Sequence, residues 1–380
     1  MNKIKMFFSS LLKKDATKTV ITSLWCALIG LILGFVILLC INPSQAPYGM
    51  TSVLGNYLIF SSMSDKLHYF GQTLAKTAPL IAMSLSILVC YKAGLFNLGA
   101  SGQYSVAVLI ISFLGYGADM PWWFTMIVAM IVASLYAMIT GALKAYFNVS
   151  EVISGIMLNW IALYIVNGIL TNSTSVWDAS HSKAFDIPTS SNAYIPSIGL
   201  DYLFSGNTIV GLGMILILIV AILTHILFKK TTIGYELKTT GLNGYAAQYA
   251  GISKTKSILI ATAISGALAG LAASLNIQNG FTAWTLSSTP PVIGFQGISS
   301  AFLGGLHPIG VIFSSYFIVH ITDGGSMITD LGFSPEVASI MTSVIIYFSG
   351  FVFFAKEIMH RNEMKNEFNK LSRDKEEEVS

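Results

Sequence analysis

Long, nearly uncharged apolar runs alternate along this chain with short polar segments. The runs 24–41, 209–228 and 340–355 are continuous and approach the roughly 20 residues that a helix needs to cross about 30 Å of hydrocarbon. A membrane barrel would instead show segments of about ten residues in which apolar and polar positions alternate. The pattern therefore predicts an all-α, polytopic membrane protein.

The apolar runs divide into ten predicted transmembrane helices. Their approximate bounds are 20–41, 73–91, 97–115, 122–143, 151–171, 207–228, 257–277, 292–304, 308–322 and 336–355. The eighth is short, and only Gly305 to His307 lie between it and the start of the ninth. Short segments interrupted by Gly and Pro often line a pathway, because their backbone groups need partners that lipid does not offer.

The distribution of charge sets the orientation of these helices. Ten crossings place both termini on one side, which we assign to the cytoplasm. All but three of the 21 Lys and Arg residues then fall in inner segments, the exceptions being Lys66, Lys76 and Lys183. The positive-inside rule predicts this bias. The domains follow as a cytoplasmic segment 1–19, a transmembrane domain 20–355 with an inner loop 229–256, and a charged cytoplasmic tail 356–380.

The composition excludes a soluble protein and indicates no catalytic chemistry. Only 10% of the residues are charged and 54% are hydrophobic, whereas soluble proteins carry about 25% charged residues. The sequence contains no phosphate-binding loop, no paired acids and no metal-ligand spacing, so we expect no enzyme, cofactor or metal site. Carboxylates such as Glu151 and Glu336 begin helices, where negative charge is favoured, and none is placed centrally in a span. This weighs against a proton-coupled carrier.

Neutral polar side chains within the spans are therefore the candidates for a solute pathway. Amides donate and accept hydrogen bonds, which suits a neutral polar solute, and aromatic rings stack on a flat one. The alternative for each residue is a hydrogen bond between helices or a helix cap. The predicted pathway residues are Asn97, Gln103, Asn159, Trp160, Asn276, Phe295 and Gln296.

Small residues at helical spacing mark a second feature of the seventh span. They recur every four residues on one face, at Thr262, Gly266, Gly270 and Ser274. Small residues let helix backbones approach closely in lipid, so we interpret this stripe as a packing surface.

The inner loop contains the most organised polar segment, 234–252. Asn243 is placed to cap a helix over 244–250, and Gly251 is placed to end it. Such a helix is too polar to span and would lie flat at the cytoplasmic face. It is either an interfacial connector or a docking helix for a soluble partner.

Four stretches of the chain resemble the permease subunits of ABC importers, in the branch that includes sugar, branched-chain amino acid and nucleoside permeases. The inner segment resembles the family's coupling segment, of the form G-x-x-L-x-x-x-G-x-N-x-x-A-A-x-x-A-G-I. The other three stretches are 93–103, where Ser101 stands in place of the family's common Glu, then 151–160, and 294–298 together with 303–308. The resemblance assigns ATPase coupling to Gly234, Glu236, Leu237, Gly241, Asn243, Ala246, Ala247 and Gly251.

The resemblance implies one subunit of an importer in the cell membrane of a bacterium. The expected partners are an ATP-binding cassette subunit, a second permease subunit and an extracytoplasmic substrate-binding lipoprotein, with ATP bound by the partner. Nucleosides are the expected substrates. Riboflavin and ribose-like sugars are alternatives within the family, and a stand-alone secondary carrier is an alternative outside it.

Overall fold

A computed structural model describes residues 15–349 and residue 351. The chain in this range is almost entirely helical, with a single pair of two-residue strands among the described residues. The predicted N-terminal segment lies mostly outside the described residues, and the predicted charged tail 356–380 lies wholly outside them.

Each of the ten predicted spans coincides with a helix. These are α2 (Asp15–Ile41), α4 (Met63–Lys92), α5 (Ala100–Ile111), α6 (Trp122–Phe147), α7 (Glu151–Thr171), α9 (Leu212–Lys230), α12 (Lys254–Ile277), α13 (Ile293–Leu303), α14 (Pro308–Ser326) and α15 (Pro335–Ser349). The π-helical turn η2 (Ser112–Gly117) extends α5. Seven helices in the described part of the chain are long and apolar enough to cross a membrane. With 11 residues, α13 reaches only about 16 Å at 1.5 Å per residue and is too short to cross alone.

Short elements fill the two sizeable loops that separate the spans. The first loop contains α3 (Ala46–Gly55) and the 3-10 helix η1 (Asn56–Ile59), which the sequence analysis did not predict. The second contains the antiparallel strands β1 (Trp177–Asp178) and β2 (Lys183–Ala184), paired Trp177 to Ala184, and the short helix α8 (Leu200–Leu203). A further 3-10 turn, η3 (Met327–Leu331), follows α14.

The core is built around α4 and α12. Most of α4 from Thr73 to Cys90 is buried, and α12 packs against α4, α5 and α6. The predicted stripe of small residues makes the α6 contact: a Cβ added to Gly270 would lie 2.8 Å from the carbonyl oxygen of Ala129. The packing interpretation of the stripe is confirmed.

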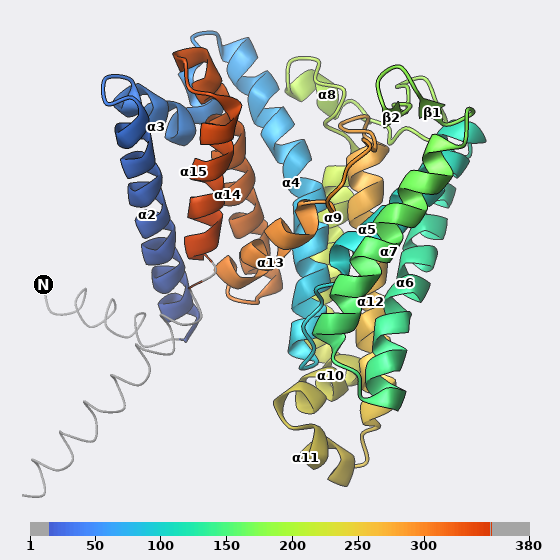
Figure 1. Cartoon of the computed structure of the whole chain (residues 1–380). Helices are drawn as coiled ribbons and strands as arrows, with labels where there is room; N and C mark the ends of the chain where they lie inside the picture. Colours follow the sequence, from blue (N-terminus) through green and yellow to red (C-terminus); the bar gives the residue numbers. More distant parts are fainter. Residues whose placement is uncertain (1–14, 350, 352–380) are drawn as a thin grey trace, which may run out of the picture.

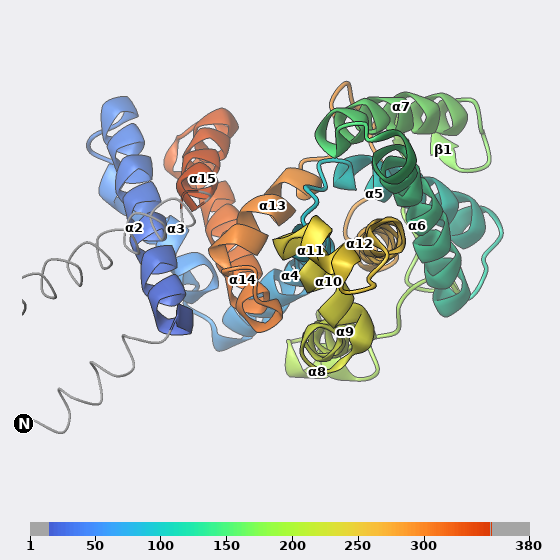
Figure 2. The same cartoon turned by 90° about the horizontal axis from the view of Figure 1, so that it is seen from below.

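The two ends of the bundle carry different elements (Figure 1). One end bears α3, α8 and the two strands, and the other bears α10 (Thr232–Leu242) and α11 (Gly244–Tyr249). Seen from below, α10 and α11 lie across the ends of the central helices (Figure 2), and α10 contacts α4, α9 and α12. Because α4, α6 and α9 end at this side, they bring Lys92, Lys144 and Lys230 to it.

Candidate functional site

The turn between α4 and α5 is a meeting point for the four sequence stretches that we singled out. At Gly94 the backbone adopts φ +77°, a left-handed conformation that favours glycine. A Cβ added to Gly94 would lie 2.9 Å from the Cα of Gly241 in α10. The inner segment therefore contacts the α4–α5 turn backbone against backbone.

The same turn packs closely against the start of α7. A Cβ added to Gly155 would lie 2.9 Å from the backbone nitrogen of Gly99. The side chain of Asn159 donates to the carbonyl oxygen of Leu98 at 2.7 Å and accepts from the amide of Gly102 at 2.7 Å. Asn159 thus links α7 to the backbone of the α4–α5 turn and gives the Gly102 amide a second acceptor beside the carbonyl oxygen of Gly99 at 3.1 Å.

A third contact joins the beginning of α5 to α13. A Cβ added to Gly294 would lie 2.9 Å from the backbone nitrogen of Ser101, and the Ser101 hydroxyl donates to the carbonyl oxygen of Pro291 at 2.9 Å. Ser101 is buried, so the residue that replaces the family's common Glu acts here as a link to α13.

Asn97 and Gln103 form a buried amide pair inside this turn. Each donates to the other at 3.1 Å, and Asn97 also donates to the hydroxyl of Ser265 in α12 at 2.7 Å. Ser265 in turn donates to the carbonyl oxygen of Ser86 in α4 at 2.9 Å. Together with Asn159, these predicted pathway residues hydrogen-bond neighbouring helices to one another. Whether they also meet solute stays a prediction.

A cavity of about 300 Å³ lies between α4, α12, α13 and α14. Its volume is at the lower end of the roughly 300–1,000 Å³ typical of small-molecule pockets. The first half of α4 and the final residues of α12 and α14 contribute to it, and these parts lead towards the end that carries α3 and α8 (Figure 1). The lining residues are Lys76, Pro79, Leu80, Asn276, Phe281, Thr282, Ile293, Gln296, Ile318, Val319, Thr322 and Asp323.

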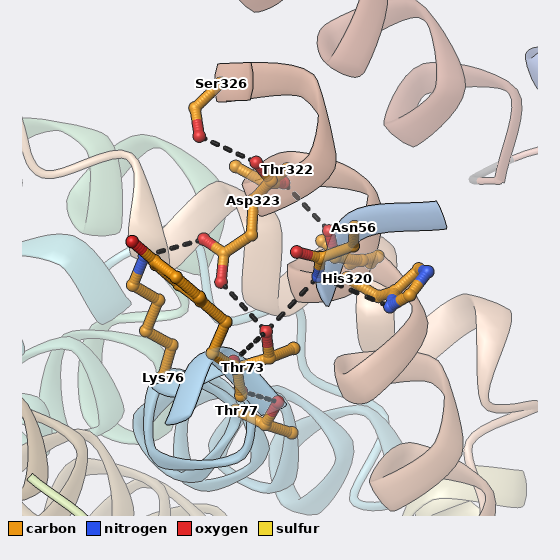
Figure 3. A network of polar contacts seen from close by, with 10 residues as sticks. Asn56, Thr73, Lys76, Thr77, His320, Thr322, Asp323 and Ser326 are labelled. Atoms are coloured by element: carbon orange, nitrogen blue, oxygen red, sulfur yellow. Dashed lines mark hydrogen bonds and ion pairs between the residues drawn. The ribbon is translucent and has the colours of Figure 1, made fainter. Parts of the chain in front are cut away.

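An ion pair borders this cavity. The ammonium of Lys76 in α4 donates to the carboxylate of Asp323 in α14 at 2.7 Å (Figure 3), and the two side chains are only 24% and 14% exposed. The ammonium also lies over the ring of Phe281, 4.9 Å from its centroid. A charge removed from water needs a partner of opposite charge, and Lys76 and Asp323 are partners for each other.

Polar groups behind the ion pair extend it towards α3. The Thr73 hydroxyl lies 3.3 Å from the second carboxylate oxygen of Asp323, and the Asn56 amide donates to Thr73 at 3.2 Å. The Nε2 of His320 faces the carbonyl oxygen of Leu54 at 2.9 Å, while its Nδ1 faces the Asn56 amide at 3.4 Å. A neutral imidazole protonated on Nε2 satisfies both contacts.

Some of the predicted pathway residues line this cavity and others do not. Asn276 and Gln296 line the cavity. Asn276 donates to the hydroxyl of Tyr104 at 2.6 Å, which leaves its amide oxygen available. Trp160 lies on the exposed face of α7, and Phe295 is exposed on α13 beside Gln296, so neither ring lines this cavity.

Sequence reasoning missed Asp323, Phe281 and the importance of Lys76. Asp323 falls one residue beyond the predicted span 308–322, yet α14 continues to Ser326. Asp323 therefore lies within the last turn of α14, so it does not contradict the expectation that no carboxylate is central in a span. A usable signal was present, because Lys76 is a cation inside the predicted span 73–91 and a buried cation requires an acidic partner.

The inner segment folds as predicted in its local detail. The Asn243 side chain accepts from the amides of Tyr245 and Ala246, both at 3.1 Å, and so caps α11. Gly251 follows with φ +82°, where the chain turns into Ile252. The Thr231 hydroxyl caps α10 through the amide of Gly234 at 3.1 Å.

The faces of α10 and α11 differ sharply in exposure. Leu237 and Ala247 are buried, whereas Leu242 and Tyr249 are 88% and 95% exposed. Glu236 is partly exposed and Ala246 is exposed. An apolar and aromatic surface at the polar end of a helical bundle is typical of a protein–protein contact. Among the described residues, no group of three or more His, Cys, Asp or Glu side chains is arranged to hold a metal ion.

Comparisons with known proteins agree with these features. A family model described as "branched-chain amino acid transport system / permease component" matches residues 69–350. The nucleoside ABC transporter permease protein NupB of Lactococcus lactis is 31% identical, covering 91% of this chain and 94% of that protein. The guanosine ABC transporter permease protein NupP of Bacillus subtilis is also 31% identical, covering 84% and 90%.

A more distant relative carries a different substrate name. The glucose ABC transporter permease protein TsgB13 of Haloferax volcanii is 27% identical, covering 73% of this chain and 76% of that protein. No solved structure matches the chain.

Proposed function

The chain belongs to the permease-component family of branched-chain amino acid transport systems, and we propose that it forms the membrane pathway of an ATP-driven nucleoside importer. Its relatives are ABC transporter permeases, which are transport subunits of multi-pass membrane complexes. The nucleoside and guanosine permeases are more similar to this chain than the glucose permease is, which favours a nucleoside over the sugar alternative.

In this proposal the chain crosses the membrane ten times, with both termini in the cytoplasm. The segment 278–292 and the short helix α13 together make the eighth crossing, because the chain descends from the end of α12 to α13 (Figure 1). The inner end then bears α10, α11 and the lysines that end α4, α6 and α9. The positive-inside rule supports this orientation.

Three partners complete the importer. An ATP-binding cassette subunit docks on the exposed surface of α10 and α11, a second permease subunit lies beside the chain in the membrane, and a lipoprotein delivers solute to the end that carries α3 and α8. No cofactor is bound by this chain, and ATP is bound and hydrolysed by the cassette subunit.

The main support for this function is a continuous chain of contacts from α10 to the cavity. Gly241 in α10 lies against Gly94, the α4–α5 turn continues to Ser101, and Ser101 bonds to Pro291 and packs on Gly294 at the start of α13. Because α13 forms one wall of the cavity, a displacement of α10 is transmitted through packed backbone to the solute site. ATP-driven closure of the cassettes would thereby alternate the side to which the cavity opens.

The side chains that line the cavity suit a nucleoside. Asn276 and Gln296 present amide groups to a base, Phe281 presents an aromatic ring, and Lys76 with Asp323 presents charged groups to hydroxyls. These groups supply both donors and acceptors, as a neutral polar solute with a flat ring requires. The remaining lining is mostly apolar, which is typical of small-molecule sites.

Uptake of radiolabelled uridine and guanosine by cells that express the complete importer tests this function. Cells without the chain are expected to lose ATP-dependent uptake of both compounds. Equal uptake with and without the chain, or uptake of glucose or riboflavin in place of nucleosides, would remove the assignment.

Docking on α10 and α11 is tested by L242E and Y249E. Both side chains project from the fold, so the variants should keep membrane expression while losing co-purification of the cassette subunit. Y202E is the control, since Tyr202 is 85% exposed on α8 at the other end of the bundle. The pair Ala246 and Ala247 is less suitable, because Ala247 is buried and its replacement would disturb packing. Normal co-purification with either variant would place the docking surface elsewhere.

A further inference from the structure

The ion pair at the cavity leaves part of its hydrogen-bonding capacity unused. One carboxylate oxygen of Asp323 accepts from Lys76 at 2.7 Å, and the other has the Thr73 hydroxyl at 3.3 Å. An ionised carboxylate has about four acceptor sites, and an ammonium has three donors. Among the described residues, the Lys76 ammonium also contacts the face of the Phe281 ring, which accepts no full hydrogen bond.

Two acceptors, the carbonyl oxygen of Tyr69 and the carboxylate of Asp323, compete for the single hydroxyl hydrogen of Thr73. Its hydroxyl lies 3.0 Å from the carbonyl oxygen of Tyr69 and 3.3 Å from Asp323, so the shorter bond leaves the carboxylate oxygen without a strong donor. Asp323 is therefore an acceptor in the cavity lining whose hydrogen-bonding capacity is only partly used by these two contacts. Both Asp323 and Lys76 line the cavity.

A vicinal diol is the solute group that matches this acceptor. Two neighbouring hydroxyls donate together to the oxygens of one carboxylate, and dinucleotide-binding folds use an acidic residue for the ribose 2′-hydroxyl in the same way. The adjacent ammonium donates to the oxygens of those hydroxyls. Hydrogen bonds to a charged group are stronger than those between neutral groups, so such a site discriminates against a missing hydroxyl.

Two other residues of the cavity lining offer groups suited to a base. The Asn276 amide oxygen is available, and the Gln296 side chain makes no hydrogen bond within the described part of the chain. Amides both donate and accept, so they accommodate the edges of different bases. These two amides are uncharged, which distinguishes them chemically from Lys76 and Asp323.

We propose that Asp323, held by Lys76, binds the ribose 2′- and 3′-hydroxyls, and that the permease itself selects ribonucleosides over 2′-deoxynucleosides. This inference rests on the proposed nucleoside function. The amides of Asn276 and Gln296 tolerate several bases, while the pair of Lys76 and Asp323 requires the intact diol. Selection thus occurs in the membrane in addition to any selection by the lipoprotein.

The experiment compares uptake of uridine and 2′-deoxyuridine by the complete importer with an unchanged lipoprotein. Because the lipoprotein is constant, a change in the ratio of the two uptake efficiencies reports on the permease. We expect wild type to prefer uridine and D323N to reduce that preference by about 10-fold or more, the factor associated with a hydrogen bond to a charged group. The matched control is D186N, which alters a second Lys–Asp pair, Lys183 to Asp186 at 2.6 Å, in the exposed loop.

A charge-swapped variant separates recognition from bracing of the helices. K76D together with D323K restores an ion pair between α4 and α14 but moves the carboxylate to the other helix. We expect normal assembly of the complex with loss of the uridine preference. A preference retained in the swap or in D323N, or equal uptake of both compounds by wild type, would refute the diol assignment. Absence of any nucleoside uptake by wild type would instead refute the proposed function.

Discussion

Gly94 and Gly241 touch backbone to backbone, so that a methyl group on Gly94 would approach the Cα of Gly241 to 2.9 Å. The contact joins the α4–α5 turn to α10, at the end of the bundle where α4 ends. Neither glycine leaves room for a side chain on the facing surface. The inner segment is thus held against the bundle by this backbone contact together with the buried side chain of Leu237.

The first prediction concerns this contact. G241A should separate α10 from the α4–α5 turn, because the added methyl group meets the carbonyl of Lys92 and the backbone of Gly94. We expect a loss of about 1–3 kcal/mol in stability, the usual cost of overpacking, together with a marked fall in ATP-dependent uptake. The unfolding temperature in detergent and the uptake rate are the measurements.

G168A is the control for that variant. A Cβ added to Gly168 in α7 meets nothing within 4 Å, so the substitution should be neutral or slightly stabilising. If G241A and G168A behaved alike, the close contact with Gly94 would have no role in coupling.

The second prediction tests the seam between α6 and α12. G270A should destabilise the bundle by about 1–3 kcal/mol, since its methyl group would meet the backbone of Ala129 and Met130. A267V is the control on the same helix. Ala267 borders a surface groove of about 270 Å³, which has space for the two added methyl groups. Thermal unfolding in detergent should separate the two variants, and equal unfolding temperatures would argue against a tight seam at Gly270.

The third prediction compares Phe281, which is proposed to contact the base, with Trp160, which the sequence predicted as a pathway residue. F281A should lower the efficiency of nucleoside uptake by roughly 10-fold, since stacking of a base on an aromatic side chain is worth about that factor. W160L should change uptake by less than about 2-fold, because Trp160 lies on the exposed face of α7 and does not line the cavity. A loss with W160L as large as that with F281A would contradict the assignment of the base to this cavity and would support Trp160 as a pathway residue.

The fourth prediction concerns pH and the large loop that precedes α9. Asp119 accepts from the Ser191 hydroxyl at 2.5 Å and from the backbone and side chain of Asn192 at 3.0 and 2.9 Å. These hydrogen bonds, with that of Ser191 the strongest, hold the pKa of Asp119 below its ordinary value of 3.8. A carboxylate with a lowered pKa stabilises the fold at pH above 3.8, and that contribution is lost as the pH falls through the lower value.

Hydrogen exchange measures this tie. D119N should lower the protection factors of residues 189–195 by roughly 2- to 5-fold at pH 7, as expected for an exposed polar contact. Acidification below 3.8 should lower protection in wild type by an additional step that D119N does not show. Identical acid responses in both proteins would mean that Asp119 does not anchor the loop.

Local patterns were sufficient for the long apolar helices and for the inner segment, but not for the short helices α3 and α8. The apolar runs predicted ten spans, and a helix overlaps each predicted range, while seven helices in the described part of the chain are long and apolar enough to cross a membrane. Asn243 and Gly251 were assigned as cap and stop because both roles depend on neighbouring backbone groups only, and the structure confirms them. The stripe with Gly266 and Gly270 was interpretable because helical periodicity alone places its members on one face.

Relationships between distant residues depended on the tertiary structure. The amides Asn97, Gln103 and Asn159 look in the sequence like lining for a polar pathway, yet each is buried and bonded to neighbouring segments. A polar side chain in a span needs a partner, and the sequence does not say whether that partner is solute, water or another helix.

The ion pair of Lys76 and Asp323 shows this division most clearly. Apolar periodicity, which is local, determines where helices form and how the inner segment is capped. Lys76 and Asp323 are 247 positions apart, and only the packing of α14 against α4 brings their charges together. The electrostatic energy of a pair of charges depends on their distance in space and not on their separation in sequence. The tertiary packing of the helices therefore determined the cavity and the position of Lys76 and Asp323 in its lining.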